Sequence, residues 1–94
     1  MNPVAKFNIN NFKEVVREIE ENGDISYLRL LENRVIHDII KLIEKNTKEA
    51  KAELSKLELI VNEDLGFTPR NGLLVSALRN SIKGALAAAK LYLF

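Results

Sequence analysis

The side chains best placed to do chemistry in this sequence are cations in its last third. Residues 65–94 hold four basic residues and no acidic one, whereas residues 1–64 hold 13 acidic and 10 basic residues. Arg79, Lys83 and Lys90 fall within about 40° of one another on a helical wheel, so they form one stripe. The stripe predicts contact with an acidic surface of a partner protein, with a nucleic acid, or with acidic residues of the same chain.

An acidic stripe of the same chain is available on the first predicted helix, where Glu14, Glu18 and Glu21 share a face. The two stripes could therefore face each other inside one bundle. Three cations alone would release few counterions from DNA, so this stripe by itself predicts only weak nucleic-acid binding.

Glu32 is a second candidate for a partner-binding residue, because it falls inside an apolar arc of its helix with Leu28, Val35 and Ile39 as neighbours. Burying an unpaired carboxylate is costly. We therefore expect Glu32 to pair with Arg29 or with a cation of the last helix, or else to contact a second chain.

The last four residues, Leu91, Tyr92, Leu93 and Phe94, are three apolar residues and a tyrosine at the end of the sequence. Chain ends fray unless they are tied down. The segment is therefore expected either to close the chain's own core or to dock on a partner.

Catalytic and metal-binding patterns are missing from the sequence. With no Cys and one His, it cannot form disulfides, thiolate zinc sites or a catalytic cysteine. It also contains no phosphate-binding glycine loop, nucleophile elbow or His-Glu-x-x-His pattern. His37 falls on a polar helix face and is expected at the surface. We expect a non-enzymatic protein without cofactor or metal.

The composition fits one small domain, since the chain has 94 residues, 47% of them hydrophobic, and a net charge of +1. Uninterrupted apolar stretches of the roughly 18 residues that a membrane span needs do not occur. The first residues lack the apolar core of a secretion signal, so a cytoplasmic location is expected. Absence of Gln with abundant Lys, Glu and Ile suggests a thermophile, although ten Asn argue against it.

The periodicity predicts an all-α fold with an N-terminal arm at residues 1–10 and one helical-bundle domain at residues 11–94. The first helix is expected to start at Asn11, which forms a capping-box spacing with Glu14, and to stop at Asn22–Gly23.

A second apolar stripe runs from residue 25 to residue 64 without Gly or Pro and keeps its angular register past Asn46. It predicts one continuous helix about 60 Å long at the centre of a three-helix antiparallel bundle. Asn46 and Glu49 also have capping-box spacing, so the alternative is a break there and a four-helix bundle. Asp24 or Ser26 can cap the start of this segment.

The last helix is expected over residues 69–92, after a stop at Leu65–Gly66 and with Thr68 as N-cap and Pro69 as first helical residue. Its predicted core face consists of Leu74, Leu78, Ile82, Ala85, Ala89 and Tyr92. Three such helices would leave apolar surface bare, which predicts a permanent protein partner or a homodimer.

In size and style the chain resembles the small helical accessory subunits of crenarchaeal family-B replicative DNA polymerases. The resemblance rests on the Gln-free, Ile/Lys/Glu-rich composition and on capped helices opening at Asn11–Glu14 and Thr68–Arg70. It implies a non-catalytic subunit that docks on a polymerase catalytic subunit or another replication complex, and it transfers no functional residue. Bacteriocin immunity proteins are also similar, as Cys-poor helical bundles, and residues 91–94 would then read the target.

Overall fold

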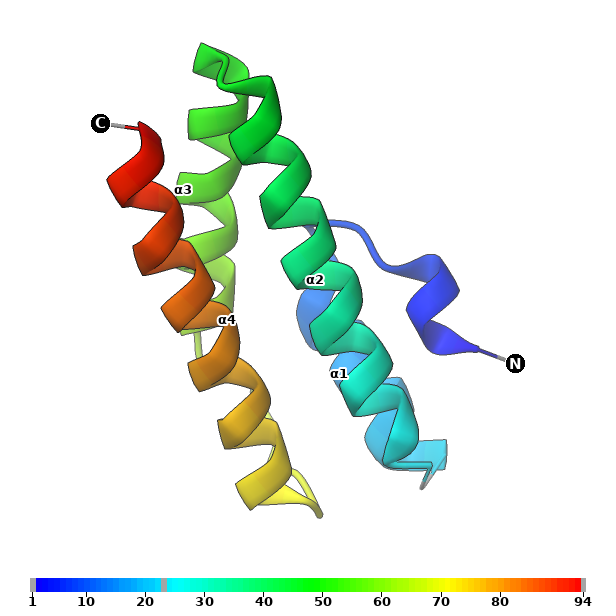
Figure 1. The fold of residues 1–94 in the computed structure, drawn as a ribbon. Coiled ribbons are helices and arrows are strands. Elements are labelled where there is room, and N and C mark those ends of the chain that lie inside the picture. The colour runs from blue at the N-terminus through cyan, green and yellow to red at the C-terminus, as the bar shows by residue number, and fades with distance from the viewer. Residues whose placement is uncertain (1, 23, 94) are drawn as a thin grey trace.

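Two helices that run in the same direction, α2 and α4, form the longest contact of the molecule (Figure 1). The computed structural model describes residues 2–22 and 24–93. A short 3-10 helix, η1, precedes four α-helices, whose bounds are η1 Pro3–Lys6, α1 Phe12–Asn22, α2 Ser26–Lys45, α3 Lys48–Asn62 and α4 Gly72–Leu93. The described residues contain no strand, which confirms the predicted all-α class.

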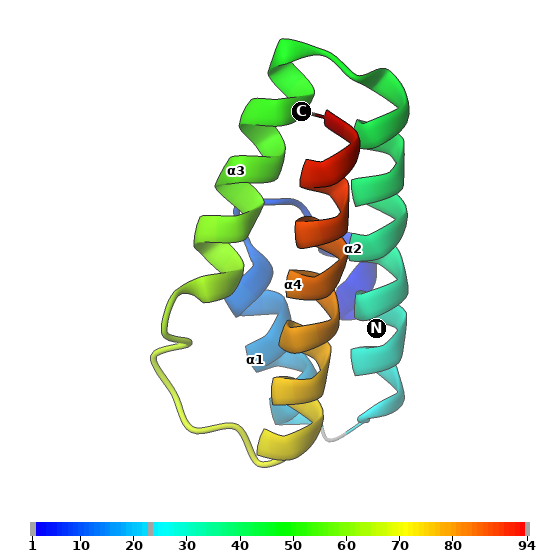
Figure 2. The same ribbon diagram turned by 60° about the vertical axis from the view of Figure 1, so that its left-hand side comes forward.

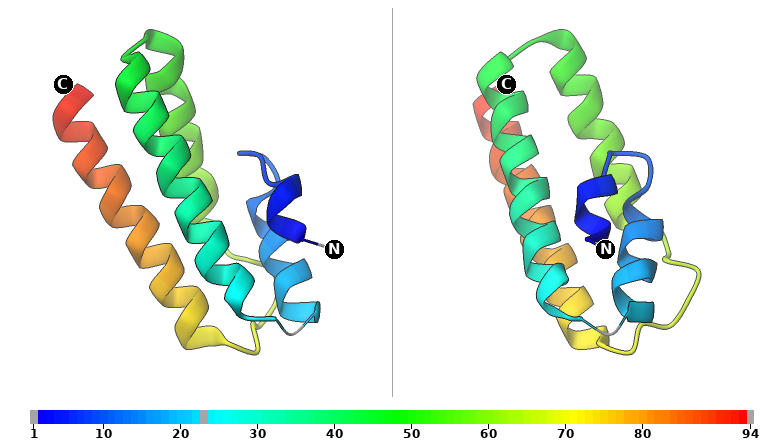
Figure 3. Two further views of the ribbon diagram at one scale, coloured as in Figure 1. Left: turned by 45° about the vertical axis from the view of Figure 1, so that its right-hand side comes forward. Right: turned by 90° about the vertical axis from the view of Figure 1, so that its right-hand side faces the viewer.

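Helix α3 runs antiparallel to both α2 and α4 and packs against each of them (Figure 2). Helix α1 is only about half as long as α2 and lies beside α2 and α3, with η1 against α1 and α2 (Figure 3). The bundle is therefore three long helices with a short fourth, and its longest extent is 39 Å.

The predicted continuous helix over residues 25–64 is wrong, because the chain reverses direction at Asn46. Asn46 has a φ of 47°, in the left-handed region, and its amide donates to the Leu42 carbonyl at 3.1 Å. Thr47 then caps α3, since its hydroxyl accepts from the amide of Ala50 at 3.1 Å. Asn tolerates left-handed geometry and Thr is a good N-cap, so the two residues together end one helix and start the next. A helix of about 60 Å would also not fit the molecule.

Replacing Asn46 provides a direct test of this break. Asn46→Ala is expected to lower the free energy of unfolding by about 1 kcal/mol, because alanine has a Cβ clash at positive φ that Asn partly offsets. Asn46→Gly is expected to change it by less than about 0.5 kcal/mol. Urea denaturation of both variants measures the difference. A stabilising effect of alanine would mean that residue 46 lies inside a helix.

The core face of α4 differs from the prediction by a rotation of about 50° at 100° per residue. Leu78, Ile82 and Ala89 are buried as expected. Leu74 and Tyr92 are exposed instead, and their places in the core are taken by Val75, Leu86 and Leu93. On α2 the buried residues are Leu28, Leu31, Val35, Ile39 and Leu42. The rotation leaves an apolar side of α4 in solvent.

The first ten residues, predicted as an arm, pack against the helices of the bundle. Pro3, Val4 and Phe7 are buried against α1 and α2. Asn11 holds this segment in place, because its side-chain amide donates to the Lys6 carbonyl at 2.7 Å and its side-chain oxygen accepts from the Asn8 amide at 2.8 Å. Helix α1 thus begins at Phe12. The Asn11 side chain bonds to residues 6 and 8 of the N-terminal segment and does not form the predicted capping box with Glu14.

Helix ends near residue 66 also differ from the prediction. Helix α3 ends at Asn62, before Gly66, and α4 begins at Gly72 rather than at Pro69. The N-cap position of α2 is held by Ile25, whose side chain makes no capping hydrogen bond, so neither Asp24 nor Ser26 is the N-cap. Asp24 accepts from the Ser26 amide at 3.1 Å just before the helix. The predicted stop at Gly23 lies outside the described residues.

Candidate interaction surfaces

The side of α4 that faces away from α2 and α3 carries apolar side chains in solvent. Its residues are spaced alternately four and three apart and are all exposed. We call this set the outer face: Leu73, Ala77, Asn80, Gly84, Ala87 and Leu91. Leu73 is 90% exposed and Leu91 is 82% exposed, and on one flank Tyr92 is 77% exposed. Apolar surface that is contiguous over about a few hundred Å² typically marks a site of protein contact.

The outer face carries no charged residue, because the three cations of α4 lie off it. Arg79 points to the end of α3, where its Nε and Nη2 donate to the Val61 carbonyl at 2.9 and 2.6 Å. Its Nη2 also donates to the Glu63 carbonyl at 2.7 Å. Val61 lies in the last turn of α3 and Glu63 is the C-cap residue, so neither carbonyl has a helical partner. Arg79 therefore acts as a C-cap of the neighbouring helix.

Lys90 also faces α3, where it forms an ion pair with Glu58. Lys83 is exposed, and no acidic side chain of the described residues lies within ion-pair distance of it. The predicted stripe is thus divided: Arg79 and Lys90 are engaged inside the chain, and Lys83 remains available at the edge of the outer face.

The predicted pairing of this stripe with the acidic residues of α1 is wrong. Within the described residues, Glu18 pairs with Lys6 of η1 at 3.5 Å, while Glu14 and Glu21 pair with no cation. The cations of α4 contact α3 instead, because α3 and not α1 lies along that side of α4.

Glu32 is partly buried on α2, and in the described part of the chain no cation lies within ion-pair distance of it. The predicted internal pair with Arg29 or with a cation of α4 is therefore absent. Partial exposure lets water solvate the carboxylate, which removes the need for a partner.

The C-terminal segment divides between the two predicted alternatives. Leu93 is buried in the chain's own core, whereas Leu91 and Tyr92 are exposed. Phe94 lies outside the described residues. Helical geometry explains the division, since Leu93 shares the inner face with Ile82 and Leu91 shares the outer face with Leu73.

Glu20 is a structural residue that the sequence analysis missed. It is 4% exposed, and its Oε2 accepts from the amides of Arg70 at 2.7 Å and Asn71 at 3.2 Å, just before α4. Its Oε1 is buried without a hydrogen-bond partner among the described residues. A carboxylate at a helix N-terminus satisfies amides that lack helical partners and interacts favourably with the helix dipole. Because Glu20 extends the apolar face of α1 by one residue beyond Ile19, its burial could be suspected from spacing, but its partner could not.

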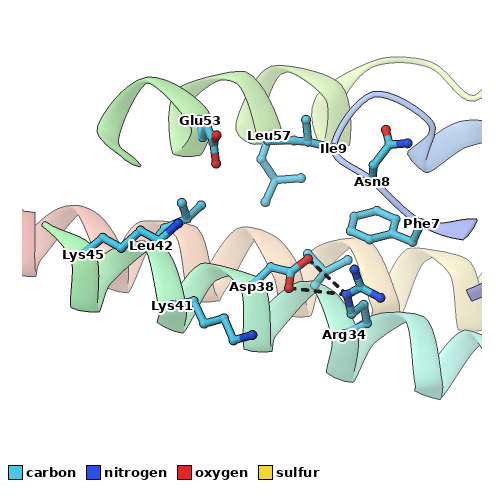
Figure 4. A pocket seen from close by; sticks show the side chains of 11 residues that line it. Phe7, Asn8, Ile9, Arg34, Asp38, Lys41, Leu42, Lys45, Glu53 and Leu57 are labelled. Carbon is cyan, nitrogen blue, oxygen red and sulfur yellow. Dashed lines mark hydrogen bonds and ion pairs between the residues drawn. The ribbon is translucent and has the colours of Figure 1, made fainter. Parts of the chain in front are cut away.

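A groove of about 310 Å³ opens between residues 7–9, which follow η1, and helices α2 and α3 (Figure 4). Phe7, Leu42 and Leu57 line its apolar floor. Arg34 is already engaged there, because it pairs with Asp38 at 3.3 Å and lies 5.8 Å from the ring centroid of Phe7. The remaining rim residues carry both signs of charge: Lys41, Lys45 and Glu53. The groove therefore presents no single chemistry to a ligand.

The described residues contain no cluster of three or more His, Asp or Glu that could hold a metal ion. Their helices include none with the length and apolar character needed to cross a membrane. Comparison of the chain with protein-family models, with curated proteins and with solved structures finds no match.

Proposed function

We propose that this protein is a non-catalytic accessory subunit that docks on a larger protein through the outer face of α4. The observation that carries the proposal is the exposure of Leu73 and Leu91 at the two ends of a helix face without charge. Each Å² of apolar surface that docking buries contributes about 25 cal/mol, so covering this face is favourable.

Lys83 supports a surface that orients its partner on binding. It lies at the edge of the outer face without an internal partner in the described residues. A rim charge of this kind affects the encounter rate and the orientation of a partner more than its affinity. Nucleic-acid binding is the weaker proposal, because Arg79 and Lys90 contact α3.

A polymerase catalytic subunit or another replication complex is the first partner to test. This choice rests on the resemblance in composition and helix capping alone, and it carries no residue assignment.

The test compares the tagged chain with a double variant, Leu73→Lys and Leu91→Lys, in extract of the source organism. We expect a stoichiometric protein partner to co-purify with the unmodified chain and to be lost from the double variant. Leu59→Lys is the matched control, because Leu59 is 68% exposed on α3 and lies away from the outer face. The proposal fails if no partner is recovered, or if the double variant retains it.

A further inference from the structure

The outer face has the symmetry of a surface that pairs with itself. Its six positions lie at equal distances on either side of Ile82, which points the opposite way into the core. Two copies of α4 placed antiparallel and centred on Ile82 would therefore match each residue with a defined counterpart. The matched pairs are Leu73 with Leu91, Ala77 with Ala87, and Asn80 with Gly84 of the other copy.

Each of these pairs is chemically compatible. The two leucine pairs bury the most exposed apolar side chains of the face. Ala77, Ala87 and Gly84 allow the helix axes to approach to about 8 Å, the lower end of helix-packing distances. Open space surrounds Gly84, with no other atom within 4 Å of a Cβ built there. The Asn80 side chain of the other copy can occupy that space.

The charges of α4 also permit self-pairing. The outer face has no charge that would meet its own sign across a two-fold axis. Antiparallel helices bring the positive end of one dipole to the negative end of the other. Lys83 is the one charge that opposes self-pairing. It lies one residue from the two-fold axis, so the Lys83 side chains of the two copies would approach each other on the same flank of the interface.

The available area suits a weak dimer. Residues 73–91 span about 27 Å, and a strip about 10–12 Å wide gives a footprint of about 300 Å² per protomer. Protruding side chains have more accessible surface than the flat strip that they cover, so the two protomers together bury on the order of 1,000 Å² of accessible surface. This total lies just below the usual range for stable complexes, as expected of a weak and reversible dimer.

We propose that the outer face is the interface of a two-fold symmetric homodimer, in which α4 packs antiparallel against α4 of a second copy. The inference rests on the proposed function in taking this face as a docking surface. It names a second copy of the chain as the occupant, which another protein that binds the same face would displace. In an isologous interface of this type each residue pair occurs twice.

Sedimentation of the purified chain alone, from about 1 to 500 µM, tests the occupant. We expect a reversible shift from monomer to dimer, lost in the Leu73→Lys, Leu91→Lys double variant and kept in Leu59→Lys. Removing the Lys83 charge by Lys83→Ser is expected to tighten association about two- to fivefold at low salt, because it relieves repulsion across the axis. A chain that stays monomeric throughout this concentration range overturns the inference. The proposed function is then decided separately, by whether a different protein co-purifies with the chain.

Cysteine cross-linking tests the orientation, and the chain has no cysteine of its own. Leu73→Cys mixed with Leu91→Cys is expected to give a disulfide-linked dimer, whereas each variant alone is expected to give little. Ser55→Cys, exposed on α3, is the control for random collision. Efficient cross-linking of each variant with itself would show parallel helices and would overturn the antiparallel pairing.

Discussion

Replacing Glu20 with alanine is expected to lower the free energy of unfolding by about 2 kcal/mol. The carboxylate accepts from two amides before α4, and hydrogen bonds to charged groups contribute about 1.5–3 kcal/mol. Loss of the negative charge at a helix N-terminus adds to the effect. The unpaired Oε1 opposes it, because its desolvation cost disappears with the side chain.

Thermal unfolding followed by circular dichroism measures this change as a decrease of roughly 10 °C in Tm. Glu20→Gln keeps one acceptor oxygen and is expected to lose about half as much. Glu21→Ala is the matched control, since Glu21 is exposed one residue further along α1, and it is expected to change stability by less than about 0.5 kcal/mol. Equal effects at positions 20 and 21 would contradict the cap.

Replacing Arg79 with methionine is expected to lower the free energy of unfolding by about 1.5–2 kcal/mol. The substitution keeps much of the apolar stem of the side chain but removes all donors to the Val61 and Glu63 carbonyls. The carbonyls of the last turn of α3 then depend on water alone, which is less favourable where they are partly buried.

Denaturation in urea measures the loss, with two variants for comparison. Arg79→Lys keeps the charge but cannot reproduce the planar fork, so it is expected to recover less than half of the stability. Lys83→Met removes an exposed cation of the same helix and should have an effect below about 0.5 kcal/mol. If both methionine variants behave alike, Arg79 does not act as a C-cap.

The all-α class and the approximate helix positions follow from local patterns in the sequence. Apolar spacing of 3.6 residues locates α1, α2 and α3. The capping-box spacing of Asn46 and Glu49 marks a real boundary, although Asn46 is the C-cap of α2 and Thr47 is the N-cap of α3. The prediction of one continuous helix is wrong because an apolar register that continues past residue 46 does not require the helix itself to continue. A left-handed Asn followed by a Thr N-cap can reverse the chain even where the apolar register continues.

The position of α4 and its contacts could not be derived in the same way. Apolar residues occur around much of this helix, so their spacing does not select one rotation. The observed rotation places Arg79 at the end of α3 and leaves Leu73 and Leu91 outside. These contacts join segments distant in sequence, and nothing in the local pattern indicates them. For the same reason the ion pair of Lys90 with Glu58 could not be predicted.

The contact between Glu20 and the amides of Arg70 and Asn71 also orders events during biosynthesis. About 50 residues separate the carboxylate from these amides. A chain synthesised from its N-terminus therefore exposes α1 well before the segment that α1 caps has left the ribosome. The nascent α1 cannot reach its final surroundings until the segment before α4 emerges, so closure of the bundle waits until α4 has been synthesised.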